Sequence, residues 1–221
     1  VSALCGDMGG HGFAIAKDNP ARVEQSKRIM DLAKDLETDV VTTHIGVIPS
    51  DPAQDRYRIL QDALGAMGEY GDEVGAHFAI ETGPEKSTVL KGFLDSLSSG
   101  GVRVNLDPAN LVMVTDEDPV EAVHVLKDDI VHTHAKDGIM KQKTDPERIY
   151  NFFAEGGIED LRMEDYFLET PLGQGDVDFP KYLKALEEAG FHGFLTIERE
   201  VGEQPEKDIR LAVDFLKNIL R

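Results

Sequence analysis

The sequence contains only one cysteine and no long apolar run. A single thiol, Cys5, excludes an internal disulfide and fits a reducing compartment. Its neighbours Val1, Ala3 and Leu4 predict that Cys5 is a buried strand residue. No segment approaches the roughly 20 apolar residues that a membrane helix needs, and no basic segment followed by an apolar one marks a secretory signal. These absences predict a cytoplasmic protein with no membrane partner.

Bases are also scarce: 42 acids face 23 bases, and the formal net charge at pH 7 is -19. A nucleic-acid surface normally requires a basic patch, and none is visible, so we expect no nucleic-acid partner. Most of the acids lie in helical stretches, where they predict a solvated surface. Residues 173–176, GQGD, predict a tight turn near the site, but they lack the preceding strand and the glycine spacing of a dinucleotide fingerprint. No nicotinamide or P-loop nucleotide site is indicated.

Short apolar runs alternate with helix-like segments along the chain, which is the pattern of a βα repeat. The expected strands are residues 1–5, 40–44, 77–81, 102–106, 130–134 and 195–198. Apolar residues recur at helical spacing in residues 22–36 and 206–220. Four prolines are expected where helices begin: Pro52, Pro84, Pro119 and Pro180. Because the chain has 221 residues and no low-complexity linker, we expect one domain that spans residues 1–221.

The spacing of the strand ends predicts an α/β fold, the (β/α)8 TIM barrel. From His44 to Glu81 is 37 residues and the next two steps are 26 and 27, close to the roughly 31 per unit of an eight-unit barrel. The step from His134 to Glu198 is 64 residues. It indicates an insertion at residues 138–170, either a lid over the substrate or a small packed subdomain. Because only six strands are recognisable, we expect the chain to lack the first two βα units, as a fragment of a longer product.

Four residues that can bind a metal recur at the ends of apolar runs: Glu81 in HFAIETG, Asp107 in VRVNLDPAN, His134 in IVHTHAKD and Glu198 in FLTIERE. Strand alternation places each of them opposite the apolar residues that pack against a helix. Barrel active sites lie at the carboxyl ends of the strands, so the four predict one metal site. Three carboxylates and an imidazole favour Mn²⁺, with Mg²⁺, Co²⁺ or Zn²⁺ as alternatives. Taken singly, Asp107 is also explained as a cap before Pro108, and the others as exposed strand ends.

Two of these residues, Glu81 and Glu198, are the expected catalytic groups. A divalent ion polarises a carbonyl or a pair of hydroxyls and lowers the cost of removing the neighbouring C–H proton. The two glutamates lie on strands three units apart, so we expect them to approach opposite faces of a bound sugar. One would remove the proton and the other would return it, as epimerisation or aldose–ketose exchange requires.

Four further residues are candidates for substrate binding: His44, Asn110, His132 and Lys136. His44 ends its strand with inward parity, although a core or capping role explains it equally well. His132 lies one pleat deeper than the metal-binding histidine and is expected to orient a ligand or the substrate. Asn110 follows a proline turn, where asparagines are often structural. Lys136 would neutralise an anionic substrate group or hold an acid, and a salt-bridged loop lysine is the alternative.

These residues resemble those of the xylose isomerase-like TIM-barrel superfamily of sugar phosphate isomerases and epimerases. The matching segments run through most of the chain: TTHIG, AIETG, NLDPANL, HTHAKD, LGQGDVDF and GFHGFLTIERE. The resemblance implies that Glu81, Asp107, His134 and Glu198 are the metal ligands and that the two glutamates are the acid/base pair. Asn110 departs from the family, because many ketose epimerases have a substrate-binding histidine there. We also expect the segment of the family's first two strands to be missing from this sequence.

The leading functional hypothesis is a divalent-metal-dependent isomerase or epimerase of a sugar, a sugar phosphate or a polyol-derived ketone. A dehydratase of a keto-polyol such as an inosose is the first alternative, since it begins with the same proton removal. An endonuclease IV-like metallo-phosphodiesterase, a Schiff-base aldolase that uses Lys136, and a sugar-binding barrel without turnover are also compatible with the pattern. The expected partner is a small carbohydrate, and a homo-oligomer is a further expectation.

Overall fold

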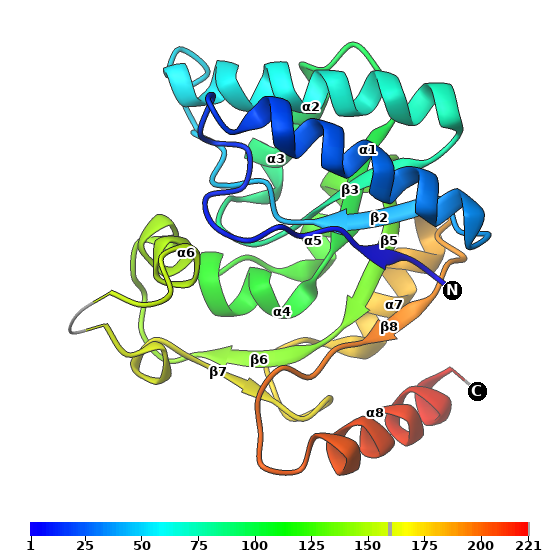
Figure 1. Ribbon diagram of the computed structural model, residues 1–221. Coiled ribbons are helices and arrows are strands. Elements are labelled where there is room, and N and C mark those ends of the chain that lie inside the picture. The colour runs from blue at the N-terminus through cyan, green and yellow to red at the C-terminus, as the bar shows by residue number, and fades with distance from the viewer. Residues whose placement is uncertain (159–160, 221) are drawn as a thin grey trace.

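Six parallel strands form the main sheet, which curves into part of a barrel (Figure 1). The computed structural model describes residues 1–158 and 161–220. In sheet order the strands are β1 (Leu4–Cys5), β2 (Val40–Thr43), β3 (His77–Glu81), β4 (Val102–Leu106), β5 (Ile130–Ala135) and β8 (Leu195–Ile197). Every neighbouring pair is parallel. All six strands expected from the apolar runs are therefore present, and sheet order follows chain order except that β8 pairs directly with β5.

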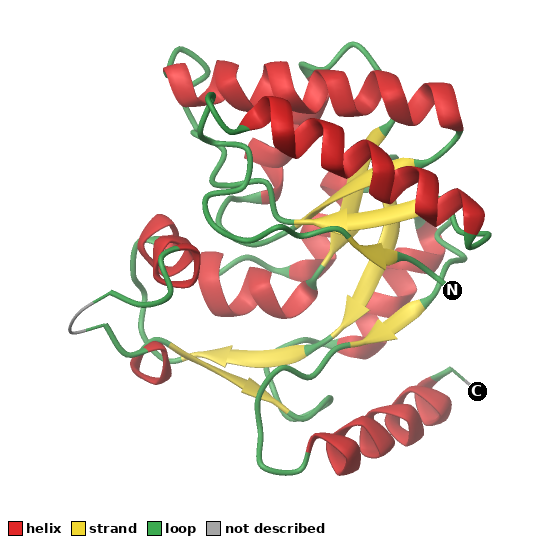
Figure 2. Cartoon of the chain, viewed as in Figure 1, coloured by secondary structure: helices red, strands yellow, loops and turns green. Residues whose placement is uncertain are grey.

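Helices alternate with these strands and cover the outer side of the sheet (Figure 2). They are α1 (Asn19–Asp35), α2 (Asp55–Val74), α3 (Ser87–Asp95), α5 (Pro119–Leu126), α7 (Phe179–Glu188) and α8 (Pro205–Ile219). The outward residues Phe78, Ile80 and Val104 are at most 1% exposed and belong to the same core cluster as Leu60 and Phe93 of the covering helices. The expected alternation of apolar and polar strand faces is thus confirmed, and the polar residues are left for the inner side.

The prolines mark helix starts in only two of the four predicted places. Pro119 is the first residue of α5 and Pro180 is the second residue of α7. Pro52 and Pro84 lie three residues before α2 and α3, so their prediction was wrong by about one turn. At Pro52 the reason is a local turn, in which the backbone N–H of Ala53 donates to the Asp51 carboxylate at 2.9 Å and delays the helix.

The insertion at residues 138–170 contains secondary structure that the sequence did not predict. β6 (Asp137–Met140) and β7 (Phe167–Thr170) form an antiparallel pair, and α6 (Pro146–Ala154) lies between them in the chain. Two contacts hold α6 against the barrel. Arg56 forms a bidentate ion pair with Glu147, with N–O distances of 2.5 and 3.0 Å, and the Tyr150 hydroxyl donates to the carbonyl of Gly10 at 3.2 Å. The α6 segment of the insertion is therefore attached to α2 and to the loop that follows β1.

The turn at residues 173–176 is organised by the carboxylate of Asp137. Its Oδ2 accepts hydrogen bonds from the backbone N–H groups of Gly173 and Gly175, both at 2.9 Å. A Cβ at position 175 would lie 2.2 Å from the Asp137 carboxylate, so this close approach requires glycine. The predicted tight turn is present and connects the end of β7 to α7.

The prediction that Cys5 is buried was wrong. Leu4 packs against the core, whereas Cys5 lies on the other face of the two-residue edge strand β1 and is exposed. An edge strand this short is paired on one side only, so apolar neighbours in the sequence do not ensure that it is covered. None of the helices in residues 1–158 and 161–220 combines the length and the apolar character needed to cross a membrane.

Candidate metal centre

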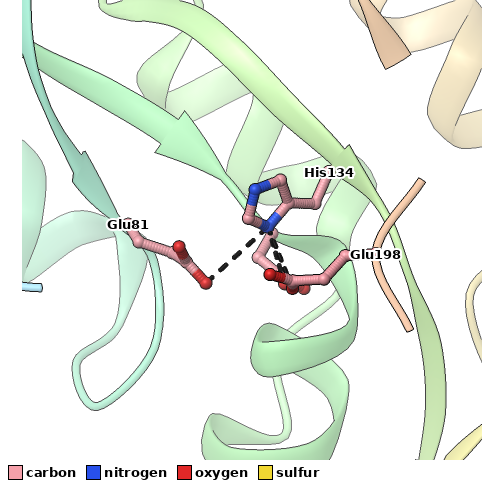
Figure 3. A group of neighbouring side chains, drawn as sticks. Glu81, His134 and Glu198 are labelled. Carbon is pink, nitrogen blue, oxygen red and sulfur yellow. Dashed lines mark hydrogen bonds and ion pairs between the residues drawn. The ribbon is translucent and has the colours of Figure 1, made fainter. Parts of the chain in front are cut away.

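Glu81, Asp107, His134 and Glu198 come together at the carboxyl ends of β3, β4, β5 and β8. One potential ligand atom from each lies within 4.8 Å of those from the other three. Glu81 ends β3, Asp107 and Glu198 directly follow β4 and β8, and His134 is the second-last residue of β5. Figure 3 shows Glu81, His134 and Glu198 pointing toward one another. The cluster is the one expected from strand parity.

The imidazole of His134 lies at the centre of three carboxylates. Its Nδ1 is 3.1 Å from Glu198 Oε2, 3.3 Å from Asp107 Oδ2 and 3.7 Å from Glu81 Oε1. Burial lowers the pKa of His134, but hydrogen bonds to Asp107 and Glu198 and the charge of Glu81 raise it to about 11. The three acids thus stabilise a positive charge at this point, where a divalent cation would compete with the proton.

The carboxylates themselves are mostly buried. Asp107 is 0% exposed and Glu81 is 7% exposed. Burial raises the pKa of Glu81 to about 7, despite the opposite effect of His44 and His134. For Glu198 burial also acts to raise the pKa, but His134 and Lys136 outweigh it and hold the pKa below its usual range. The two candidate proton carriers therefore differ in basicity.

Asp107 both caps a helix and faces the site. Its Oδ1 accepts hydrogen bonds from the backbone N–H groups of Ala109 and Asn110, at 2.8 and 3.0 Å, at the start of the short helix α4 (Pro108–Asn110). Its Oδ2 is the atom that approaches His134. Asp107 can thus cap the helix with one oxygen and bind a metal with the other. The sequence had presented these two roles as alternatives.

This donor set fits a hard divalent cation. Three carboxylates and one imidazole are the ligands that Mn²⁺ and Mg²⁺ accept, and no thiolate is among them. The residues that would hold the ion are Glu81, Asp107, His134 and Glu198.

Asn105 lies on β4 one pleat below Asp107 and contacts two residues of the cluster. It was not among the predicted site residues. Its Nδ2 lies 3.1 Å from Glu81 Oε2 and 3.3 Å from His134 Nε2, and its Oδ1 accepts from His132 Nδ1 at 2.8 Å. The Nε2 of His134 faces Asn105, so the Nδ1 of that ring faces the carboxylates. Asn105 shares the strand face of Asp107, so parity applied one pleat deeper would have identified it.

His132 lies in the same network. Its Nε2 accepts from the Thr196 hydroxyl at 2.9 Å, and the ring is 3% exposed. Burial and the nearby charge of His134 lower the pKa of His132 to about 4, so the ring is neutral. These contacts favour the expected orienting role, toward His134 through Asn105, over contact with a substrate.

Lys136 is buried among acids. Its Nζ is 2.9 Å from Glu198 Oε2, pairs with Glu200, and is 3.8 Å from carboxylate oxygens of both Asp107 and Glu169. Burial lowers the pKa of Lys136, but the surrounding carboxylates raise it well above its usual range. Because the Lys136 ammonium keeps its charge and is surrounded by carboxylates, it holds the acids in place. A charged ammonium cannot attack a carbonyl, which argues against a Schiff-base aldolase.

Glu169 on β7 connects the insertion to this site, and no pattern in the sequence pointed to it. Its Oε1 accepts from Arg199 Nη1 at 2.7 Å and from the backbone N–H of Glu200 at 3.0 Å. These contacts fix the segment that directly follows Glu198. Glu169 lies in a short hairpin strand without clear apolar and polar alternation, so its position near the site becomes evident only from the three-dimensional structure.

His44 and Asn110 both contact Glu81. The Nε2 of His44 is 3.7 Å from Glu81 Oε1, and its Nδ1 is 3.5 Å from Asp7 Oδ2. Asn110 Nδ2 donates to Glu81 Oε1 at 3.2 Å and to the carbonyl of Thr82 at 3.1 Å. Both side chains also line a cavity of about 740 Å³ that includes Glu81, Lys136 and Glu198. A substrate in this cavity would therefore be able to contact both side chains, as their predicted role requires.

The fold and the site together define a barrel protein with a candidate divalent-metal centre at the carboxyl ends of its strands, which is the catalytic end of such barrels. The chain belongs to the xylose isomerase-like TIM barrel family, whose model matches residues 1–219. The fold class expected from the sequence is thereby confirmed.

Known relatives include enzymes. Inosose dehydratase from Lacticaseibacillus casei is 25% identical over 150 residues, which cover 66% of this chain and 48% of the relative. The chain thus spans about half the length of this curated relative. The crystal structure of a xylose isomerase domain protein from Planctomyces limnophilus is 26% identical, with a TM-score of 0.75 and coverage of 94% of this chain and 67% of that one. The 3-keto-D-glucoside 4-epimerase of E. coli shares the fold, with 14% identity, a TM-score of 0.69 and coverage of 99% and 79%.

One buried carboxyl, Glu85, lies outside the metal cluster and leads to a stability prediction. Its side chain is 7% exposed, and its Oε2 has no hydrogen-bond partner among the described residues. Burial raises its pKa from 4.5 to about 8, although the N–H of Ile48 and the charge of His44 act in the opposite direction. The folded protein therefore keeps this proton up to about pH 8, while the unfolded chain releases it near pH 4.5, so stability falls as pH rises between these values.

Replacing Glu85 by glutamine is accordingly expected to change the melting temperature little at pH 5 and to raise it at pH 8.5, by on the order of 5 °C. Differential scanning calorimetry of both proteins across this range measures the effect. The control is Glu188→Gln on α7, where the side chain is 58% exposed. An E85Q protein that gains nothing at high pH relative to low pH would contradict the prediction.

Proposed function

We propose that this chain catalyses divalent-metal-dependent proton transfer next to a carbonyl group, as an isomerase or epimerase of a sugar, sugar phosphate or polyol-derived ketone. The observation that carries the proposal is the placement of Glu81 and Glu198 on either side of His134, both lining one cavity. A divalent ion, Mn²⁺ in our proposal with Mg²⁺, Co²⁺ or Zn²⁺ as alternatives, would polarise the substrate carbonyl and lower the barrier to proton removal.

The proposed roles of the side chains follow from their contacts. Glu81 acts as the proton acceptor on one face, since its raised pKa suits a group that exchanges protons near neutral pH. Glu198, held by Lys136, serves the opposite face. Asn110 and His44 contact Glu81 from the cavity side and are the proposed substrate-binding groups beside it. His132 and Lys136 keep the cluster in position.

A dehydratase reaction is the second candidate, supported by the relatives named inosose dehydratase. It would begin with the same proton removal, followed by expulsion of a β-hydroxyl as water. A phosphodiesterase has less support. An endonuclease IV-like site requires a basic groove, whereas Lys136 is the one lysine or arginine that lines the cavity within the described part of the chain. A non-catalytic sugar-binding barrel would retain the ligands but show no exchange.

A screen of ketoses, aldoses and inososes in D₂O with Mn²⁺ tests the proposal. We expect deuterium incorporation at the carbon next to the carbonyl with at least one substrate, which depends on the metal and is measured by NMR and mass spectrometry. Deuterium incorporation without loss of water supports an isomerase or epimerase, and loss of water supports the dehydratase. Binding without either reaction would remove the catalytic proposal. The single-domain organisation and a homo-oligomer remain predictions that sedimentation and limited proteolysis would test.

Glu169→Gln is expected to lower turnover by roughly 10- to 100-fold with metal at saturation, because it weakens the contacts that fix the backbone after Glu198. Turnover with the substrate from the screen and a Mn²⁺ titration measure the effect. The matched control is Glu164→Gln, which also lines the cavity from the insertion but pairs with the neighbouring Arg162. Wild-type turnover in the E169Q protein would exclude a positioning role.

A further inference from the structure

The cavity above the metal centre has two chemically different parts. Its floor is polar and carries Glu81, Lys136 and Glu198. One wall is apolar and comes largely from the insertion, with Met113 from the barrel side: Met113, Ile149, Phe153, Met163, Phe167 and Leu168. The volume of about 740 Å³ lies in the upper part of the range of about 300–1,000 Å³ for small-molecule sites. The cavity therefore has room for more than the group that contacts the metal centre.

The apolar wall is partly open to solvent. Phe153 is 62% exposed and Leu168 is 42% exposed, although both are large apolar residues. The segment is held in place by the Arg56–Glu147 ion pair and the hydrogen bond from Tyr150 to Gly10. When a ligand covers exposed apolar surface that is held in place over a cavity, the removal of that surface from water favours binding. Sugar hydroxyls do not supply such a surface, so the wall fits an apolar group.

The charges of the cavity disfavour an anionic ligand. Among the described residues, six acids line it: Asp7, Glu81, Glu164, Glu169, Glu198 and Glu200. Lys136, the one lysine in the lining that the structure describes, already contacts four carboxylates. The amino end of α6, where Pro146 lines the cavity, is capped by the Asp145 carboxylate, so it has no free N–H cluster for a phosphate. Even with a divalent cation bound, a phosphate would meet a net negative surface.

Resting on the proposed function, we infer that the substrate is an uncharged carbohydrate that carries an apolar substituent, such as an aryl group. The sugar ring lies on the polar floor, and the substituent lies against the wall of the insertion. An uncharged substrate of this kind excludes sugar phosphates from the substrates of this site. It also assigns the insertion a role in substrate selection.

The test compares matched ligands with the Mn²⁺-loaded protein by isothermal titration calorimetry. For glucose, galactose and mannose, the probes are the methyl glycoside, the phenyl glycoside and the 6-phosphate. We expect the phenyl glycoside of at least one sugar to bind about tenfold more tightly than its methyl counterpart, and the 6-phosphates to bind more weakly than both. Failure of every phenyl glycoside to bind, no gain from the phenyl group, or tighter binding of a 6-phosphate would each overturn the inference.

Two variants locate the effect. Phe153→Ser and Leu168→Ser are expected to remove most of the gain from the phenyl group. Phe194→Ser is the matched control, because Phe194 is 66% exposed and is not part of the cavity lining. If F153S instead dissociates a dimer seen by sedimentation, the wall is an interface between copies and the inference fails. Tighter binding of phenyl glycosides, together with no metal-dependent deuterium exchange in any ketose, aldose or inosose of the screen, would support the inference and count against the proposed function alone.

Discussion

The E81Q and E198Q proteins are each expected to lose at least about a thousandfold in Mn²⁺-dependent deuterium incorporation and turnover. Glutamine keeps the size of the side chain and an oxygen donor, but it cannot accept the proton from carbon. The measurement is exchange in D₂O by NMR with the substrate identified in the screen, at saturating Mn²⁺. Activity of either variant within tenfold of the wild type would remove that residue from the proposed mechanism.

The loss must be separated from misfolding and from loss of the metal. Glu188→Gln provides a control for the chemical change at an exposed position on α7. A melting curve and a Mn²⁺ titration of each variant report on the fold and on binding of the ion. A variant that folds and binds Mn²⁺ but does not exchange assigns proton transfer to that glutamate. A variant that also fails to bind Mn²⁺ identifies it as a ligand.

The D107N protein is expected to lose the stabilisation that Mn²⁺ gives the wild type. At a free ion concentration one hundred times the dissociation constant, binding stabilises the folded state by about 2.7 kcal/mol, or about 5–10 °C in melting temperature for a chain of this size. Asparagine retains an oxygen that can accept the hydrogen bonds of Ala109 and Asn110, so the helix cap is preserved while the charge of the ligand is removed. Calorimetry with and without Mn²⁺ measures the difference.

Asp118→Asn is the matched control, because Asp118 caps α5 through the N–H of Val120 at an exposed position. It should show the full Mn²⁺-dependent shift.

The same titration in wild type is expected to release at least one proton per ion near pH 7. The reason is that the carboxylates hold the pKa of His134 near 11 without metal, and a ligand imidazole must be deprotonated. Apparent affinity for Mn²⁺ should therefore increase with pH. An undiminished shift in D107N would contradict the assignment of Asp107.

Strand parity predicted much of this site because it is a local property with a geometric consequence. Residues such as Glu81 and Asp107 follow apolar runs, and parallel strands bring their carboxyl ends to one edge. Asn105 obeyed the same rule but is not a usual metal ligand, so the search for acids and histidines passed over it. Glu169 could not be predicted, since it reaches the site only through the hairpin of β6 and β7, whose strands have no clear alternation.

Errors in the predicted structure have a similar origin. Cys5 and Pro52 were assigned from their neighbours in the sequence, whereas their positions depend on an unpaired strand edge and on a side-chain hydrogen bond within a turn. Local patterns determine which segments are strands and helices. They do not determine what covers a strand or how a loop is closed.

The direct pairing of β5 with β8 has a consequence for folding. Thr133 and Leu195 are register partners, although they are 62 residues apart in the chain. Closure of so long a loop is entropically costly and slow, so this pairing is expected to form late. Glu198 joins the other three ligands only after that step, so no early folding intermediate contains a complete site. Binding of the ion is thus expected to stabilise only those chains in which β8 has already paired with β5.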